Sequence, residues 1–128
     1  MKLLTILTIA AAAFAGEKFK LIKAGELASL LEKKDAKVAV FDANNEDTRK
    51  KDGVIPGAKL LSDHKGYDVA KTLPSEKDTK LVFYCANEKC MASHKAAERA
   101  VGAGYKDVAV MSDGIQGWVK QGHPASKN

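Results

Sequence analysis

Continuous apolar runs alternate along the chain with segments in which apolar residues recur at helical spacing. The three clearest runs cover residues 38–42, 81–84 and 108–111, and each is typical of a strand buried on both faces of a sheet. Shorter runs at residues 19–22 and 59–61 are further strand candidates. These runs together predict one sheet.

Helical spacing lies between the runs. Residues 24–34 place leucines on one face of a predicted helix. A second helix follows the loop after residue 84, where Ala92, Ala96 and Ala100 lie four residues apart. A last helix is predicted from residue 113 to about residue 121. Strands that alternate with helices in this way favour a mostly parallel sheet covered on both faces.

Turn signals separate these elements. Residues 43–47 are polar and predict a turn, and residues 52–58 hold two glycines that bracket a proline. A short helix is predicted around residues 67–71, followed by a polar connector at residues 74–79. The glycines at residues 102–105 predict the C-cap of the alanine-rich helix. The sequence has no internal repeat and no interdomain linker.

The first residues have the composition of a secretory signal peptide. Lys2 precedes a short apolar run that ends in Ala13-Phe14-Ala15, so cleavage is predicted after Ala15. The run is too short for a comfortable membrane span, and the alternative is an N-terminal core helix. Residues 1–15 are therefore assigned to a signal peptide and residues 16–128 to a single domain. This predicts a periplasmic or secreted protein with no stable membrane anchor after cleavage.

Charge and histidine content narrow the classes of partner. The formal net charge is +5, and acidic residues are interspersed with the lysines. Nucleic-acid binding is not expected, because it would need the basic residues clustered on one face. The excess of lysine predicts a mild attraction for small anions. His64, His94 and His123 do not have the spacing of metal ligands, and we assign no metal and no cofactor.

The candidate reactive residues follow the apolar run at residues 81–84. Cys85 follows this run directly, and a loop that contains Cys90 leads into the alanine-rich helix. The first N–H groups of a helix have no partners within it, and their field lowers the pKa of a nearby thiol. The predicted loop therefore favours a reactive thiolate at Cys85. The alternative is that Cys85 is a small buried hydrophobic residue at a strand end.

Two further polar residues belong to this candidate site. In parallel sheets, ligands bind beyond the carboxyl ends of the strands. Asp42 and Cys85 both lie at such ends, so they are expected to face one another across a site. Asp42 is interpreted either as a group that hydrogen-bonds near the loop or as a strand-end cap. Ser93 is expected to cap the helix or to contact the loop backbone.

The order of these motifs resembles that of the rhodanese family. The resemblance extends from about residue 38 to residue 124. The matching stretches are residues 40–42, 53–58, 82–85, 96–105 and 113–118. The resemblance implies a three-layer α/β/α fold with a mostly parallel central sheet.

The resemblance also implies sulfur transfer. Cys85 falls on the family's catalytic position, where the cysteine takes sulfane sulfur from a donor such as thiosulfate and passes it to a thiophilic acceptor. A persulfide of this kind needs a nucleophilic thiolate, and backbone N–H groups would stabilise its charge. Expected partners are small sulfur-containing anions, together with a thiol reductant or a sulfur-acceptor protein.

The resemblance assigns substrate binding to the active loop. Its residues are Ala86, Asn87, Glu88, Lys89, Cys90, Met91, Ala92 and Ser93. Lys89 would attract an anionic donor and Glu88 would oppose it, although Lys89 is equally well explained as an ordinary exposed lysine. The chain departs from the family in having Asn44 where arginine is common and Val54 where histidine is common. The loop is also longer than usual, as in a subset with a similar Cys-x4-Cys-x2-Ser pattern.

Other functions remain open from the sequence. The protein is alternatively a non-catalytic binding module, or a dithiol redox protein that uses Cys85 and Cys90. Phosphatase or arsenate reductase chemistry would need an arginine in the loop, and residues 85–93 contain none.

The sequence allows more than one role for Cys90. As a resolving thiol, it would attack a persulfide on Cys85 and leave a disulfide by thiol–disulfide exchange. In an oxidising compartment that disulfide would be the resting state. The alternative is that Cys90 is a buried filler at the start of the helix. A purely structural disulfide is a weaker explanation, because so small a loop gains little stability from closure.

Overall fold

A five-stranded parallel sheet forms the centre of the computed structural model, which describes residues 19–127. The strand order is β1-β5-β4-β2-β3, and every neighbouring pair is parallel. The strands are β1 (Lys20–Ile22), β2 (Val38–Asp42), β3 (Lys59–Leu60), β4 (Lys80–Tyr84) and β5 (Val108–Met111). The predicted signal peptide lies outside the described residues.

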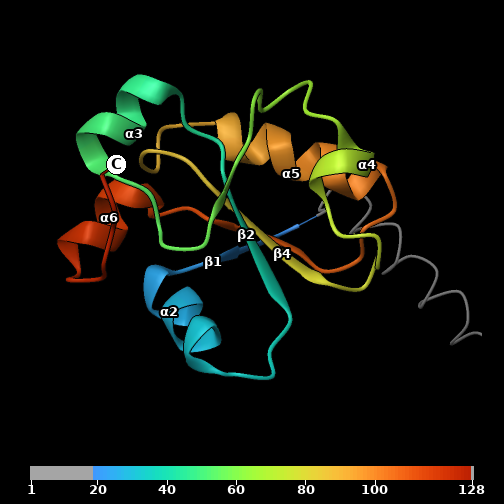
Figure 1. Cartoon of the computed structure of the whole chain (residues 1–128), viewed down its shortest axis with the longest axis horizontal. Coiled ribbons are helices and arrows are strands. Elements are labelled where there is room, and N and C mark those ends of the chain that lie inside the picture. The colour runs from blue at the N-terminus through green and yellow to red at the C-terminus, as the bar shows by residue number, and fades with distance from the viewer. Residues whose placement is uncertain (1–18, 128) are drawn as a thin grey trace, which may run out of the picture.

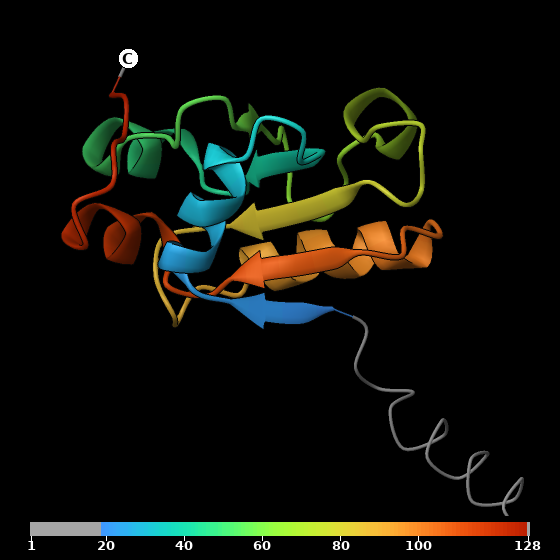
Figure 2. The same ribbon diagram turned by 90° about the horizontal axis from the view of Figure 1, so that it is seen from below.

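Helices cover both faces of this sheet, which gives a three-layer α/β/α arrangement (Figure 1). The helices are α2 (Ala24–Glu32), α3 (Glu46–Asp52), α4 (Val69–Thr72), α5 (Ala92–Gly102) and α6 (Gly114–Lys120). Helices α2 and α6 pack on one face, while α4 and α5 lie on the other. Figure 2 shows the strands pointing the same way, toward the edge where α3 and α6 lie. Both the fold class and the parallel sheet are therefore as predicted.

Strand β4 divides the core into two parts because its side chains alternate between the faces. Leu81, Phe83 and Cys85 pack toward α5, whereas Val82 and Tyr84 pack toward α2 and α6. All of them are almost fully buried. This burial on both sides explains why the strand has a continuous apolar sequence and why its carboxyl end delivers Cys85 to the α5 side.

Tyr67 anchors the stretch between β3 and β4 to helix α5. Its hydroxyl donates to the carbonyl of Ala96 in α5 at 2.8 Å, and its carbonyl accepts from Nε of Arg99 at 2.8 Å. Burial raises the pKa of Tyr67 to about 12. The short predicted helix at residues 67–71 is observed as α4, shifted by one or two residues.

Helix α3 was not predicted, and only residues 43–45 of the predicted polar turn remain outside it. None of its residues is buried, so apolar periodicity gives no signal there. Its ends explain its stability instead: Oδ1 of Asn45 accepts from the N–H of Thr48 at 2.9 Å. Acidic residues occupy its first turn and basic residues its last, which matches the helix dipole.

Within residues 19–127, no helix combines the length and the apolar character needed to cross a membrane. Helix α2 ends at Glu32, two residues before its predicted end.

Candidate active site

The backbone of Cys85 is fixed by the start of α6. Its carbonyl accepts from the N–H of Ile115 at 2.8 Å, and the next carbonyl, of Ala86, accepts from the N–H of Gln116 at 3.0 Å. The side chain of Cys85 is 1% exposed and packs on the α5 side of the sheet. The residue is thus held from the α6 side while its sulfur projects to the other.

Gly114 makes this contact between α6 and the loop possible. Its φ is +72°, in the left-handed region that favours glycine. A Cβ at this position would lie 2.4 Å from the carbonyl carbon and oxygen of Ala86 and 2.6 Å from the nitrogen of Asn87. Any larger residue would therefore push the loop away from α6.

Cys85 and Cys90 are joined by a disulfide bond. Their Cα atoms lie 6.3 Å apart, which is within the usual range for a disulfide. Two hydrogen bonds to Asn87 fold the loop back on itself: its carbonyl accepts from the N–H of Cys90 at 3.1 Å, and its Oδ1 accepts from the N–H of Lys89 at 3.0 Å. The turn at Asn87 thus returns Cys90 to the position of Cys85.

Ser93 contacts the sulfur of Cys85 and does not cap the helix. Its Oγ lies 3.3 Å from Sγ of Cys85, and the residue is 2% exposed. Because a disulfide sulfur carries no hydrogen, the hydroxyl is the donor in this contact. The N-cap residue of α5 is Met91, and its side chain makes no capping hydrogen bond.

The start of α5 offers further donors near this sulfur. Among the described residues, no acceptor is found for the backbone N–H groups of Ala92, Ser93 and His94. These groups carry the positive end of the helix dipole, which favours an anionic sulfur. The ring of His94 packs edge-on against Phe19, with centroids 5.5 Å apart.

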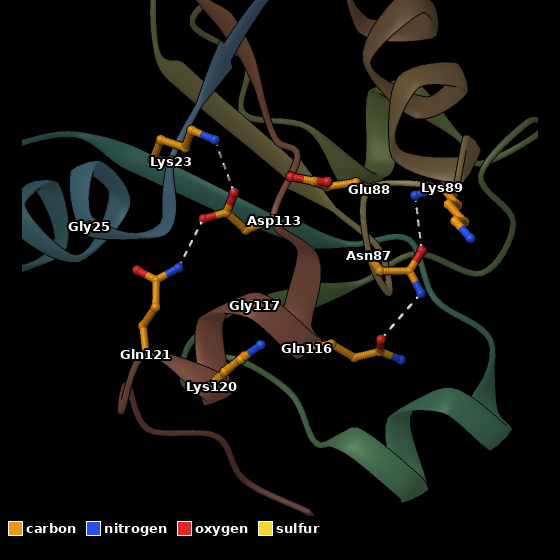
Figure 3. Close-up of a pocket in the computed structure, with 10 residues that line it drawn as sticks. All are labelled: Lys23, Gly25, Asn87, Glu88, Lys89, Asp113, Gln116, Gly117, Lys120 and Gln121. Carbon is orange, nitrogen blue, oxygen red and sulfur yellow. Dashed lines mark hydrogen bonds and ion pairs between the residues drawn. The ribbon is translucent and has the colours of Figure 1, made fainter.

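A cavity of about 830 Å³ lies on the other side of the loop (Figure 3). Nδ2 of Asn87 donates to Oε1 of Gln116 at 3.2 Å, which ties the loop to α6 at this wall. The lining residues are Lys23, Gly25, Asn87, Glu88, Lys89, Asp113, Gln116, Gly117, Lys120 and Gln121. Three lysines against two carboxylates make the lining weakly cationic. Neither cysteine lines it, so this cavity neighbours the disulfide without containing it.

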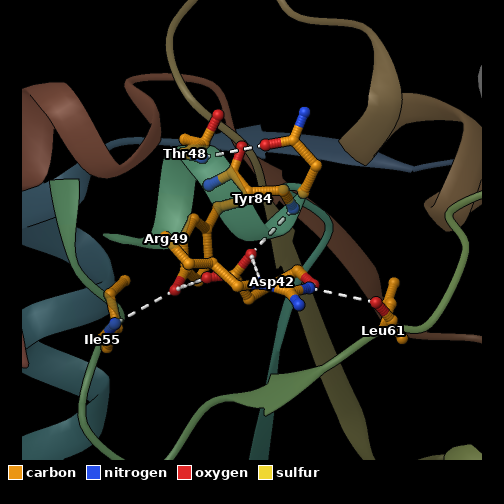
Figure 4. Close-up of polar contacts among 8 residues, drawn as sticks. Asp42, Thr48, Arg49, Ile55, Leu61 and Tyr84 are labelled. Carbon is orange, nitrogen blue, oxygen red and sulfur yellow. Dashed lines mark hydrogen bonds and ion pairs between the residues drawn. The ribbon is translucent and has the colours of Figure 1, made fainter. Parts of the chain in front are cut away.

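Asp42 is fully buried and belongs to a separate polar cluster (Figure 4). Its Oδ1 accepts from Nε of Arg49 at 3.1 Å and from the N–H of Asn44 at 2.8 Å. Its Oδ2 accepts from the hydroxyl of Tyr84 at 2.8 Å, and that hydroxyl in turn accepts from the N–H of Ile55 at 3.0 Å. Burial, and then the Asp42 carboxylate, raise the pKa of Tyr84 far above its usual value.

The expectation that Asp42 faces Cys85 is not met. Asp42 bonds with Tyr84 on the α2 and α6 side, whereas Cys85 packs on the α5 side. Successive residues of a strand point to opposite faces, which explains the separation. Among the described residues, Asp42 makes no hydrogen bond with loop residues 86–93, and it touches the site only through the neighbour of Cys85.

Arg49 was overlooked at the sequence level. Besides pairing with Asp42, its Nη2 donates to the carbonyls of Asp42 and Leu61, each at 3.0 Å. The available signal was chemical: a carboxylate that ends a buried strand needs a cation, and Arg49 is one of only two arginines in the chain. Within the described residues, no group of three or more His, Cys, Asp or Glu side chains could hold a metal ion.

A family model described as the Rhodanese-like domain matches residues 23–121. The match includes the loop, both cysteines and the start of α6. Among proteins with curated descriptions, none matches this chain significantly.

Solved structures share the fold. A protein of unknown function from Rhodopseudomonas palustris, described as a possible tyrosine phosphatase, has a TM-score of 0.67 at 24% identity over 84% of each chain. A rhodanese-like domain from Anabaena sp. has a TM-score of 0.65 at 24% identity, over 84% of this chain and 77% of that chain. A thiosulfate sulfurtransferase from Pseudomonas aeruginosa has a TM-score of 0.67 at 23% identity, over 87% of this chain but only 21% of its own. Together with the family match, this similarity of fold identifies the chain as a member of the rhodanese-like domain family.

Proposed function

We propose that this protein is a sulfurtransferase that carries sulfane sulfur as a persulfide on Cys85. One observation supports the proposal above the others. Cys85 follows a buried strand directly, and its sulfur lies 3.3 Å from the hydroxyl of Ser93, which is in the first turn of α5. This is an environment in which a thiolate, and then a persulfide anion, is stabilised at low cost.

The reaction needs the reduced form of the loop. The Cys85 thiolate attacks the outer sulfur of thiosulfate, the sulfur–sulfur bond of the donor breaks, and sulfite leaves with the bonding electron pair. The persulfide on Cys85 then gives its outer sulfur to a nucleophile such as cyanide or a thiolate, which restores the Cys85 thiolate. In the disulfide form Cys85 has no thiolate and is 1% exposed, so this form is inactive in loading.

Charge near the loop favours anionic donors. Lys89 is exposed on the loop, and Lys23 and Lys120 line the neighbouring cavity. Glu88 opposes them, and Lys23 lies 3.9 Å from Asp113, so the attraction is modest. We further propose that the protein acts outside the cytoplasm after cleavage at Ala15, with small sulfur-containing anions as its substrates.

Intact-mass spectrometry tests the proposal directly. The reduced Cys90→Ser protein, which has no second thiol to attack a persulfide on Cys85, is incubated with thiosulfate and should gain one sulfur atom, which cyanide removes as thiocyanate. Cys85→Ser should gain none, because no other thiol occupies that position. Full sulfur transfer by Cys85→Ser would refute the assignment.

The disulfide favours one second candidate, a dithiol redox protein that exchanges with other thiols without carrying sulfur. The two are separated by sulfur loading: only a sulfurtransferase gains sulfur from a sulfane donor, whereas a redox protein reduces a disulfide substrate with electrons from a thiol reductant and gains no sulfur. A binding module would do neither.

A further inference from the structure

We propose that Cys90 is the resolving thiol of the cycle, so that the protein reduces sulfane sulfur to sulfide using a dithiol reductant. The inference rests on the proposed function, because it requires a persulfide on Cys85. It adds the acceptor class, a dithiol, and the product, sulfide. The observation behind it is that the loop brings the sulfurs of Cys85 and Cys90 into a bond.

The resolving step uses that same geometry. The Cys90 thiol attacks Sγ of Cys85, the bond from Sγ to the outer persulfide sulfur breaks, and hydrosulfide leaves with the electron pair. The proton of Cys90 leaves with it, so the step needs no other reactant. The product is the Cys85–Cys90 disulfide that the structure holds.

Unequal exposure of the two cysteines determines how the disulfide is reduced. Cys85 is 1% exposed, whereas Cys90 is only partly buried, so an external thiolate reaches the sulfur of Cys90. Attack there breaks the disulfide and releases Cys85 as the leaving thiolate. The Ser93 hydroxyl and the start of α5 stabilise that thiolate. The second thiol of the reductant then displaces Cys90, and both cysteines return to the reduced state.

A structural role explains the disulfide less well. The two cysteines are five residues apart, so the bond restricts the unfolded chain little. The loop is also held by other contacts: Asn87 bonds with Lys89, Cys90 and Gln116, and α6 binds the carbonyls of Cys85 and Ala86. The loop therefore does not need the disulfide to keep its shape, and a chemical role explains the disulfide better.

A single-turnover experiment tests the proposal. The full chain is reduced, freed of reductant under anaerobic conditions and mixed with one equivalent of thiosulfate. The parent should release close to one sulfide per chain and lose the two thiol hydrogens by intact mass. Cys90→Ser should instead keep one added sulfur, and its sulfide release should be slower by a factor of about 100 or more, because the intramolecular attack is lost.

A matched control separates position from thiol content. Glu98 is exposed on α5, so Cys90→Ser combined with Glu98→Cys restores the number of thiols away from the loop. This double variant should behave like Cys90→Ser. If Cys90→Ser folds poorly, Cys90→Ala replaces it. The loss of two thiol hydrogens by the parent protein can be measured without any variant.

Each outcome decides a different proposal. Equal sulfide release by the parent and Cys90→Ser would overturn the resolving role. So would a parent that retains its persulfide with Cys90 still reduced, although sulfur transfer itself would then stand. A parent and a Cys90→Ser variant that both fail to gain sulfur from thiosulfate or another sulfane donor would overturn both proposals.

Discussion

Gly114→Ala is the single substitution that should affect the active loop most strongly without touching a reactive group. The added methyl group would lie 2.4 Å from the carbonyl of Ala86, which is backbone and cannot rotate away. Either the loop or the start of α6 must move. The hydrogen bonds from Ile115 and Gln116 to the carbonyls of Cys85 and Ala86 would lengthen as a result.

The expected cost has two parts. An alanine at φ +72° costs about 1–2 kcal/mol in backbone strain. Relieving the overlap adds about 1–3 kcal/mol, as for other overpacked sites. Gly114→Ala should therefore lower the free energy of unfolding by roughly 2–5 kcal/mol.

Gly57→Ala is the matched control. Its φ is +86°, but nothing lies within 4 Å of the place that its added methyl group would occupy, so only the strain of about 1–2 kcal/mol applies. Urea unfolding of both reduced variants measures the difference. Thiosulfate loading of Cys85 should also slow by about a hundredfold in Gly114→Ala, because reacting groups displaced by an ångström lose that much. Equal destabilisation of the two variants, with unchanged loading, would refute the role given to Gly114.

Three further predictions concern other parts of the chain. Because burial raises the pKa of Tyr67 to about 12, the native state keeps a proton that the unfolded state releases above pH 10. Tyr67 should therefore contribute roughly 1.4 kcal/mol per pH unit to the fall in the free energy of unfolding between these values, and this contribution should be absent from Tyr67→Phe, in which Tyr84 still contributes. Arg49→Met leaves the Asp42 carboxylate buried without its cation and should lower the free energy of unfolding by roughly 3 kcal/mol. Adding Asp42→Asn to this variant should restore part of that loss, as measured in a double-mutant cycle, and no recovery would contradict the pairing. N-terminal sequencing of protein from the cell envelope or medium should begin at Gly16, and an uncleaved cytosolic chain would contradict export.

The strands predicted most accurately from the sequence are those buried on both faces, where apolar residues are required. Residues 38–42 and 108–111 are β2 and β5, and residues 81–84 belong to β4, which begins one residue earlier. These are the three central strands, and both of their faces are covered. Helix α5 was predicted for the same reason, since Ala96 and Ala100 must be small where the helix meets the sheet. Helix α3 was missed because it buries nothing, and its cap at Asn45 is a local signal that apolar periodicity does not contain.

The position of Cys85 at the end of a strand was predicted from the sequence, but the contacts around it were not. That Cys85 ends a strand follows from the apolar run, but the face on which Asp42 lies depends on the register of β2 against β4. The partner of Asp42 likewise comes from a helix that periodicity did not show. Asn44 departs from the family's usual arginine, and Arg49 supplies a guanidinium beside Asp42 from a different position.

The contact between Gly114 and Ala86 lies beyond any local pattern. The two residues are far apart in sequence and meet only because β4 and β5 are neighbours in the sheet. A glycine after the last strand indicates a turn, but glycine is required at residue 114 because the backbone of Ala86 lies too close for a side chain. Long-range contacts of this kind require the strand order, which the sequence alone did not provide.

The contacts of the loop divide it into a fixed and an adjustable part. Cys85 is held through its carbonyl by α6 and through its sulfur by Ser93, whereas the described backbone contact of Cys90 is with Asn87 inside the loop itself. We therefore expect that, once the disulfide opens, Cys85 keeps its place beside the start of α5 and Cys90, which is only partly buried, moves more easily. A carrier cysteine must stay where its thiolate is stabilised, and a resolving cysteine must approach and withdraw. This asymmetry supports the proposed roles, in which Cys85 carries the sulfur and Cys90 resolves the persulfide.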